Sequence, residues 1–217
     1  MSVASTPTDD DTVVAQHREV HRRLQLWGGC AAILGALLNI APNLLLMSGS
    51  GLPGAAAQLI AVLGALLLVA AAGLLAQAFV GHPAPLGLAK LGGILLILYF
   101  SWWFAVVLIP SDWWIGGQTG GEAWNASRLV IGVGAGVAIA TSWPASGFNR
   151  WSALIVAACF GLAIYGAYAL VFGAGQAGAA GAVLLGYLQT LSLVAFGVGH
   201  AISGWRATRP ANEGAPV

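Results

Sequence analysis

Six long apolar segments run along the chain, and they constrain its fold more than any other feature. Each is near or above the ~20 residues that an α-helix needs to cross a hydrocarbon core about 30 Å thick. The strands of a membrane barrel would instead appear as segments of ~10 residues with alternating hydrophobicity. The sequence therefore predicts an all-α polytopic transmembrane bundle with six spans, at about residues 24–47, 55–80, 86–109, 123–143, 151–172 and 179–205.

The composition excludes an ordinary soluble domain. Charged residues make up 7% of the chain, where a soluble globular protein carries about 25%. The net charge is +1 and no basic stripe occurs, so nucleic acid is not an expected partner. Cys30 and Cys159 lie in apolar segments without CxxC spacing, so we expect small buried hydrophobes rather than a disulfide or a metal site.

The parts outside the spans are short and polar. Residues 1–16 contain three consecutive aspartates and no apolar period, so they are predicted to form a disordered cytoplasmic tail. Residues 17–206 would form the transmembrane domain, and residues 207–217 a second disordered tail.

The distribution of Lys and Arg predicts how the spans are oriented. One set of termini and loops holds seven of these residues, and the opposite set holds only Arg128. The positive-inside rule then places both termini in the cytoplasm. The Gly- and Ala-rich composition suggests a high-GC bacterium, so we expect a multi-pass protein of a bacterial plasma membrane. The seven residues are Arg18, Arg22, Arg23, Lys90, Arg150, Arg206 and Arg209.

The loop before the fourth span holds the candidate ligand site. Arg128 lies about four residues inside that span, where an unpaired charge costs a few kcal/mol. Glu122 or Asp112 is the expected partner, and the result would be an outward-facing site with an aromatic wall. The alternative, which the sequence favours, is an interfacial loop anchored by tryptophans, with Arg128 reaching water. The candidate ligand residues are Asp112, Trp113, Trp114, Glu122, Trp124 and Arg128.

Small residues spaced four apart predict the faces along which helices pack. This spacing places small side chains on one helix face and lets two backbones approach closely. Most of these faces would serve the bundle itself, and one is available to a partner subunit or a second copy. The candidate packing residues are Gly28, Ala32, Ala36, Gly132, Gly136, Ala195, Gly199 and Ser203.

Several polar side chains lie inside the predicted spans. Asn39 and Asn43 flank Pro42 in the first span, and Gln189 and Thr190 lie near the middle of the sixth. Pro42 frees a backbone carbonyl, which the two Asn side chains could satisfy, or they could line a cavity; a kink near the outer interface is the interpretation we favour. Amides and hydroxyls such as those of Gln189 and Thr190 most often form hydrogen bonds between helices, which we favour over contact with a ligand.

His200 is the one histidine within a span, which argues against haem and metal, because both need further ligands. Residues 200–204 (HAISG) resemble the HxxxG motif of the last helix of rhomboid proteases. Ser146, the matching serine, follows Pro144-Ala145 and falls in a predicted cytoplasmic loop, so the nucleophile motif is incomplete. An intramembrane enzyme would use His200, with Ser203 or Tyr187.

Three stretches give the chain a broader resemblance. Residues 27–35 (WGGCAAILG), 91–94 (LGGI) and 149–154 (NRWSAL) resemble segments of a loosely defined set of small bacterial six-span membrane proteins. The resemblance covers about residues 24–206. It implies a helical fold and no particular activity.

Three functional hypotheses follow. The first is a non-enzymatic accessory or assembly subunit of a larger membrane complex, with lipid and other membrane subunits or a second copy as partners and no cofactor. The alternative is a small transporter or binder of an apolar or weakly polar ligand that enters from the outer side. The third, an enzyme using His200, has the least support.

Overall fold

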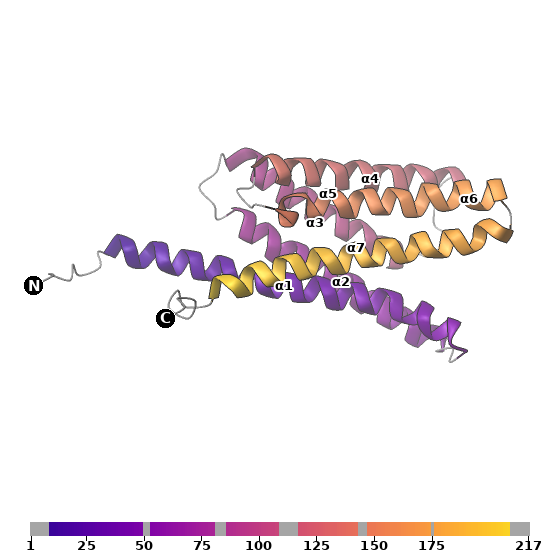
Figure 1. Ribbon diagram of the computed structural model, residues 1–217, viewed down its shortest axis with the longest axis horizontal. Helices are drawn as coiled ribbons and strands as arrows, with labels where there is room; N and C mark the ends of the chain where they lie inside the picture. The colour runs from indigo at the N-terminus through magenta and orange to yellow at the C-terminus, as the bar shows by residue number, and fades with distance from the viewer. Residues whose placement is uncertain are drawn as a thin grey trace, which may run out of the picture.

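The computed structural model describes residues 9–49, 53–80, 86–108, 117–142, 147–174 and 176–208, and nearly all of them are helical (Figure 1). No strand occurs in these ranges. The elements in chain order are α1 (Asp9–Met47), α2 (Gly54–Val80), α3 (Leu86–Leu108), α4 (Gly117–Ser142), α5 (Phe148–Gly161), the π-helical turn η2 (Leu162–Gly166), α6 (Ala167–Ala174) and α7 (Gln176–Thr208).

The predicted all-α fold with six candidate spans is confirmed for the described residues. Six helical stretches are long and apolar enough to cross a membrane, and each corresponds to one predicted segment. The fifth span is composite, because α5, η2 and α6 follow one another without a break. The π-helix is rare and occurs mostly as a single turn within an α-helix, as it does here.

Two helices begin earlier than the sequence predicts. Residues 9–16 were expected to be disordered, but they belong to α1, which starts at Asp9. Residues 117–122 were expected in a loop, and they form the start of α4. Hydropathy marks where a helix meets lipid, and a polar helix can continue beyond that boundary. At 1.5 Å per residue α1 is about 58 Å long, more than the hydrocarbon core requires.

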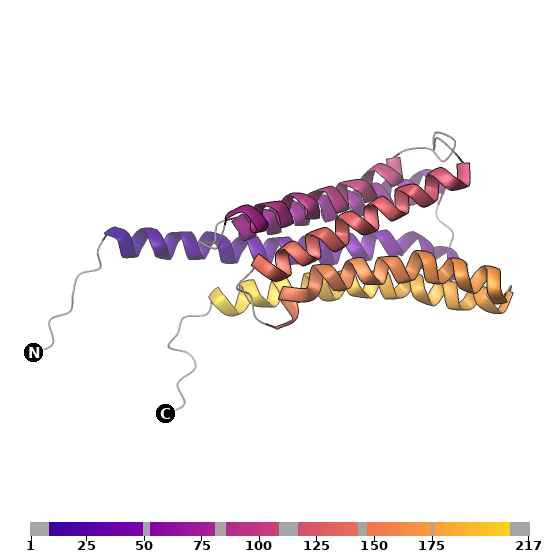
Figure 2. The ribbon, with the colours of Figure 1, turned by 90° about the horizontal axis from the view of Figure 1, so that it is seen from above.

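The helices form one closed bundle. Each packs against its neighbours in sequence, and α7 also contacts α1 and the α5–η2–α6 span. Figures 1 and 2 show that α1 begins and α7 ends at the same end of the bundle, with the first part of α1 extending beyond it. An even number of spans requires the start of the first helix and the end of the last to lie at the same end of the bundle.

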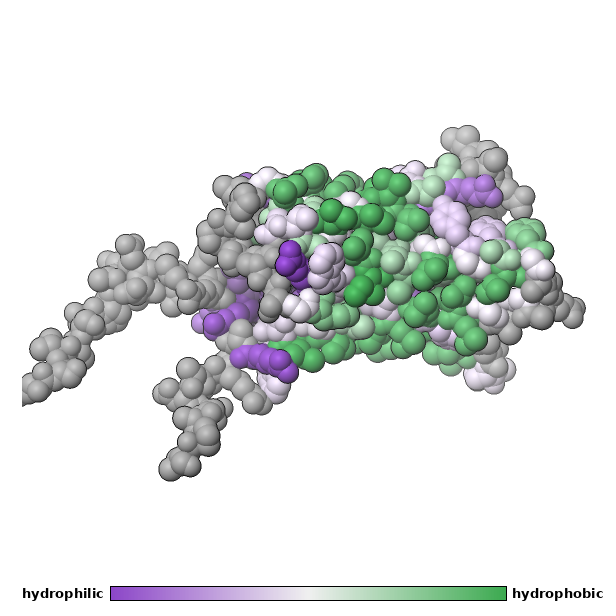
Figure 3. All heavy atoms as spheres, turned by 45° about the horizontal axis from the view of Figure 1, so that its top comes forward, coloured by the Kyte–Doolittle hydropathy of each residue, from purple (hydrophilic) through white to green (hydrophobic). Residues whose placement is uncertain are grey.

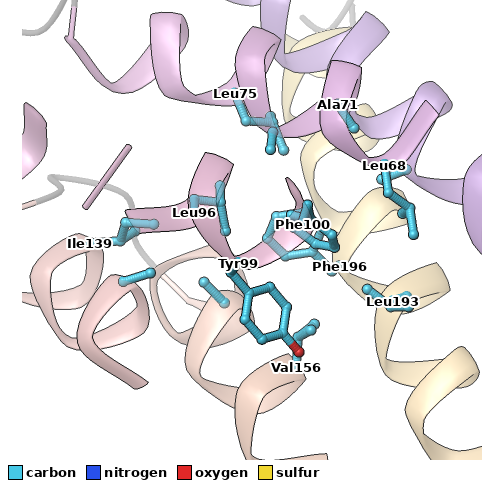
Figure 4. Close-up of a cluster of buried hydrophobic side chains, with 14 of the residues drawn as sticks. Leu68, Ala71, Leu75, Leu96, Tyr99, Phe100, Ile139, Val156, Leu193 and Phe196 are labelled. Carbon is cyan, nitrogen blue, oxygen red and sulfur yellow. The ribbon is translucent and has the colours of Figure 1, made fainter. Parts of the chain in front are cut away.

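The core lies where α3 meets the helices around it. Tyr99 and Phe100 of α3 are fully buried, and their rings meet edge to face at 5.1 Å. Figure 4 shows these side chains among residues of α2, α5 and α7, including Val156 and Phe196. Large buried aromatic rings therefore fix the separation of the helices at this level.

At the α1–α7 contact the backbones touch. A Cβ atom on Gly197 would lie 2.7 Å from the carbonyl oxygen of Gly29, and one on Gly204 would lie 2.6 Å from the amide nitrogen of Leu26. Real Cβ atoms essentially never come this close, so the packing requires glycine at both positions.

The outer surface of the bundle is apolar. Leu59, Ile94, Val130 and Leu184 are each more than half exposed. In Figure 3 green apolar side chains cover the middle of the visible face, and purple hydrophilic ones gather toward the end at which α1 begins. A soluble monomer rarely exposes such a surface, whereas lipid covers it without cost.

Candidate functional site

Arg128 is buried inside the bundle. It lies on α4 four residues before Gly132 and eight before Gly136, so the three share one helix face. That face packs inward, because a Cβ atom on Gly132 would lie 2.7 Å from the Tyr99 ring. The Arg128 side chain is 5% exposed. The interfacial alternative expected Arg128 to reach water, and its burial contradicts that expectation.

Three aromatic rings surround the Arg128 guanidinium. Its central carbon lies 4.7 Å from the ring centroid of Tyr99, 4.3 Å from that of Trp103 and 4.0 Å from that of Phe160. The faces of aromatic rings attract cations, by about 2 kcal/mol when the cation is desolvated. The protein thus stabilises this buried cation with ring faces from α3 and α5.

Within the described residues no carboxylate pairs with Arg128. Glu122 is exposed and lies six residues earlier, which turns it by about 240° around α4. The expected partnership between Arg128 and Glu122 is therefore absent. The Nε and Nη2 atoms of Arg128 are buried and have no hydrogen-bond partner in the described part of the chain. Asp112, Trp113 and Trp114 lie outside the described residues.

The other residue of the predicted aromatic wall, Trp124, packs against Trp102. Their ring centroids are 4.0 Å apart and the rings are tilted by 33°. This pair joins α3 to α4 near the start of α4. This pair is separate from the three rings that surround Arg128, which belong to Tyr99, Trp103 and Phe160.

A cavity of about 440 Å³ lies between α1, α3 and α7. Asn39, Ile40 and Asn43 line it from α1, and Trp103 lines it from α3. Its volume falls within the range of about 300–1,000 Å³ typical of small-molecule sites. The side chains that α7 contributes are Val183, Tyr187, Gln189 and Thr190, with Gly186 between them.

The cavity combines apolar walls with amides and hydroxyls. Asn39 donates from Nδ2 to the carbonyl oxygen of Gly35 at 3.1 Å, within its own helix. Thr190 similarly donates to the carbonyl oxygen of Gly186 at 3.5 Å. The buried Nε2 of Gln189 has no hydrogen-bond partner among the described residues. Thr190 is thus bonded within its own helix and not to another helix, as had been expected, and Asn39, for which a cavity wall was one of the alternatives, is among the residues that line the cavity.

Trp103 connects the two features. Its ring packs against the Arg128 guanidinium, and the same side chain lines the cavity. The Trp103 indole therefore borders both the polar cavity and the buried cation.

A second polar cluster surrounds His200. The Nε2 atom of His200 lies 3.4 Å from the Oγ atom of Ser152, which also donates to the carbonyl oxygen of Asn149 at 3.0 Å. Phe196 and Phe79 pack against the imidazole, with ring centroids 4.7 Å and 6.0 Å away. His200 and Ser152 are each 1% exposed. Their accessibility is that of core residues.

The partners expected for His200 are elsewhere. Ser203 accepts a hydrogen bond of 2.5 Å from Nδ2 of Asn149, and that atom also lies 3.0 Å from the carbonyl oxygen of Gly199. Tyr187 lies thirteen residues before His200 on α7, which is about 20 Å along the helix. The sequence did not predict Ser152 as the neighbour of His200.

Most of the predicted packing residues face inward. Gly28 lies against Leu75, and Gly136 against Leu154, at 2.8 Å and 2.6 Å from a built Cβ atom. Ala32 and Ala36 are fully buried. The exception is Ala195, which is exposed. No group of three or more His, Cys, Asp or Glu side chains that could hold a metal occurs in the part of the chain that the structure describes.

Part of the Arg128 environment had a signal in the sequence. Arg128 is spaced four from Gly132, so a packing face at Gly132 already implies that Arg128 points inward. Tyr99 and Trp103 are also four apart and share one face of α3. No local pattern points to Phe160, which comes from another helix.

Comparison of the chain with protein-family models, with curated proteins and with solved structures finds no match.

Proposed function

We propose that this protein binds, and in doing so carries or senses, a small weakly polar molecule in the cavity between α1, α3 and α7. One observation supports this most strongly. Amide and hydroxyl groups of Asn39, Asn43, Gln189 and Thr190 line a cavity at the depth of membrane-spanning helices. Polar groups at such depth are costly unless they have partners. Asn39 and Thr190 donate within their own helices, whereas the buried Nε2 of Gln189 has no partner among the described residues, and a ligand with a few polar atoms supplies one.

The accessory-subunit hypothesis remains a prediction with less support than the binding cavity. It was based on a sequence without an intramembrane carboxylate or a convergent catalytic set, and on many small-residue faces, one of which was available to a partner. Ala32, Ala36 and Gly136 are buried between helices of the same chain, so these faces serve the bundle itself.

We further propose that the protein lies in a bacterial plasma membrane with both termini in the cytoplasm, so that the cavity opens toward the outer half of the bilayer. The basic side chains of Arg22, Arg23, Lys90, Arg150 and Arg206 belong to the end of the bundle at which α1 begins. The cavity residues belong to the last third of α1 and the first half of α7, toward the opposite end.

The orientation is tested with single cysteines in a variant that lacks Cys30 and Cys159. Ser48→Cys lies at the end of α1 and Phe148→Cys at the start of α5, and both positions are exposed. A membrane-impermeant maleimide added to intact cells should label only Ser48→Cys, and both should react after lysis. Labelling of Phe148→Cys alone in intact cells would show that the orientation is opposite to the proposed one.

The binding function is tested by native mass spectrometry of the protein in mild detergent. Gly186 lines the cavity, and a Cβ atom there meets nothing within 4 Å, so Gly186→Trp fills the cavity with little strain on the fold. The wild type should retain a small molecule that Gly186→Trp loses at an unchanged elution volume. Retention of a stoichiometric protein partner and no small molecule would favour the accessory subunit instead.

A further inference from the structure

We infer that Arg128 is the receptor for an oxyanion, so that the ligand is a small amphipathic molecule ending in a carboxylate or a phosphate. This inference rests on the proposed binding function, because the anion reaches Arg128 through the same cavity. It adds the chemical class of the ligand and the side chain that recognises it.

The geometry of the unpaired donors carries the inference. The Nε and Nη2 atoms of Arg128 are both buried and both without a hydrogen-bond partner among the described residues. In a guanidinium these two nitrogens lie on the same side and direct their N–H bonds in parallel. This fork matches the two oxygens of a carboxylate or phosphate, which is why arginine binds such groups in a bidentate manner.

The surrounding rings do not satisfy the hydrogen bonds of that fork. Tyr99, Trp103 and Phe160 place their rings within 4.7 Å of the guanidinium carbon, where their π-systems attract the charge. Ring faces satisfy a cation electrostatically, but they accept no strong hydrogen bond. Buried donors without hydrogen-bond partners raise the free energy of the folded protein, and a bound anion removes this cost by accepting their hydrogen bonds. The hydroxyl of Tyr99 is buried and unpaired within the described residues as well, and it offers one more donor.

Trp103 determines how the anion arrives. It is the side chain that both lines the cavity and covers the guanidinium. In this proposal a rotation of its indole opens the way from the cavity to the guanidinium. The apolar part of the ligand then stays in the cavity against Ile40 and Val183, and the amides of Asn39 and Asn43 lie beside it.

The experiment compares three probes of equal chain length, which are octanoate, octyl phosphate and 1-octanol. Binding to the full-length protein in detergent is measured by isothermal titration calorimetry. We expect the wild type to bind at least one charged probe about tenfold more tightly than 1-octanol, the gain typical of a charge-assisted bidentate pair. This comparison needs no variant, so a folding defect cannot obscure it.

Variants then assign the preference to Arg128. Arg128→Gln should remove the roughly tenfold preference and leave 1-octanol binding nearly unchanged. Arg128→Lys keeps the charge but not the fork, and it should lose most of the preference. Arg150→Gln is the matched control, because Arg150 is an exposed arginine at the start of α5 whose Nε donates to the carbonyl oxygen of Ala140 near the end of α4. It should change nothing.

The outcomes separate this inference from the binding function. Equal binding of charged and uncharged probes, lost in Gly186→Trp, would overturn the oxyanion and keep the cavity as a binding site. A preference that survives in Arg128→Gln would overturn the role of Arg128. Failure of every probe to bind the wild type would contradict both.

Discussion

The indole of Trp103 packs against Arg128, with the guanidinium carbon 4.3 Å from its ring centroid, and it also forms one wall of the cavity between α1, α3 and α7. This relationship links the one strongly buried cation of the described residues to the space in which a ligand fits. A purely structural arginine in a membrane protein would be expected to reach the interface or to pair with an acid. Arg128 does neither within the described residues, so its burial needs another reason.

If Arg128 serves binding, its removal should cost little stability in the empty protein. A charge near the centre of a membrane helix costs about 2.5–3.5 kcal/mol, and each unsatisfied buried donor adds about 1–3 kcal/mol. Three cation–π contacts offset most of this at about 2 kcal/mol each. Arg128→Met should therefore lower the free energy of unfolding by no more than about 1–2 kcal/mol, and it can raise it, as measured by denaturant titration in detergent. A loss of about 3 kcal/mol or more, typical of a broken buried ion pair, would mean a structural role.

The α1–α7 contact should tolerate no side chain at Gly29. A Cβ atom there would collide with backbone atoms of Gly197 and Ala201 on α7, and backbone cannot move aside as a side chain can. Gly29→Ala should lower the free energy of unfolding by about 2 kcal/mol or more. Gly73→Ala is the control, since nothing lies within 4 Å of a Cβ atom at that helical position. It should stabilise the protein by about 0.5–1 kcal/mol. Equal effects of the two substitutions are incompatible with the close contact.

Asn149 should be the main polar link between α5 and α7. Its side-chain amide donates to the carbonyl oxygen of Gly199 and to Ser203 Oγ, two groups on α7. Interhelical hydrogen bonds in membranes contribute about 0.6–2 kcal/mol each, so Asn149→Ala should cost about 1–3 kcal/mol. Thr141→Ala provides a matched comparison, because that hydroxyl donates to Val137 of its own helix. It should shift thermal unfolding far less. A reversed order would show that the link is not Asn149.

The His200–Ser152 pair should not act as a nucleophile. Both side chains are 1% exposed, and Phe79 and Phe196 pack against the imidazole. A general base activates a serine only when substrate can also reach it. A fluorophosphonate probe should leave Ser152 unlabelled in the folded protein, as judged by mass spectrometry, while it labels a serine protease added to the same sample. Labelling of Ser152 that His200→Ala abolishes would restore the enzyme hypothesis.

The architecture was predictable because lipid imposes a simple rule on sequence. A span must be helical and apolar for about twenty residues, so segment length alone locates α2 and α3 to within a residue or two. The ends of α1 and α4 were harder, since no comparable rule governs a helix in water. The turns at Gly49 and Gly147 do follow local chemistry, because both adopt a positive φ that favours glycine.

The candidate site was only partly predictable. Arg128 was identified because a charge in an apolar span is conspicuous, but its partners were sought among nearby acids. Its spacing of four from Gly132 was a signal that it faces inward, but the favoured expectation was a side chain that reaches water; Phe160 enters from a helix that follows about thirty residues later. The cavity depends on how α1, α3 and α7 diverge in space, and no single segment encodes that. Gln189 was therefore assigned to a hydrogen bond between helices, although it lines the cavity.

The most direct test of the account is the ¹⁵N–¹H resonance of the Arg128 Nε group, assigned by its loss in Arg128→Lys. The burial of this atom should keep its proton from exchanging rapidly with water. We expect octanoate to shift the proton resonance downfield, as a new hydrogen bond to a carboxylate does, and 1-octanol at the same occupancy to leave it unchanged. Octanoate binding in the cavity without any change at Nε would contradict the assignment of Arg128 as the anion receptor.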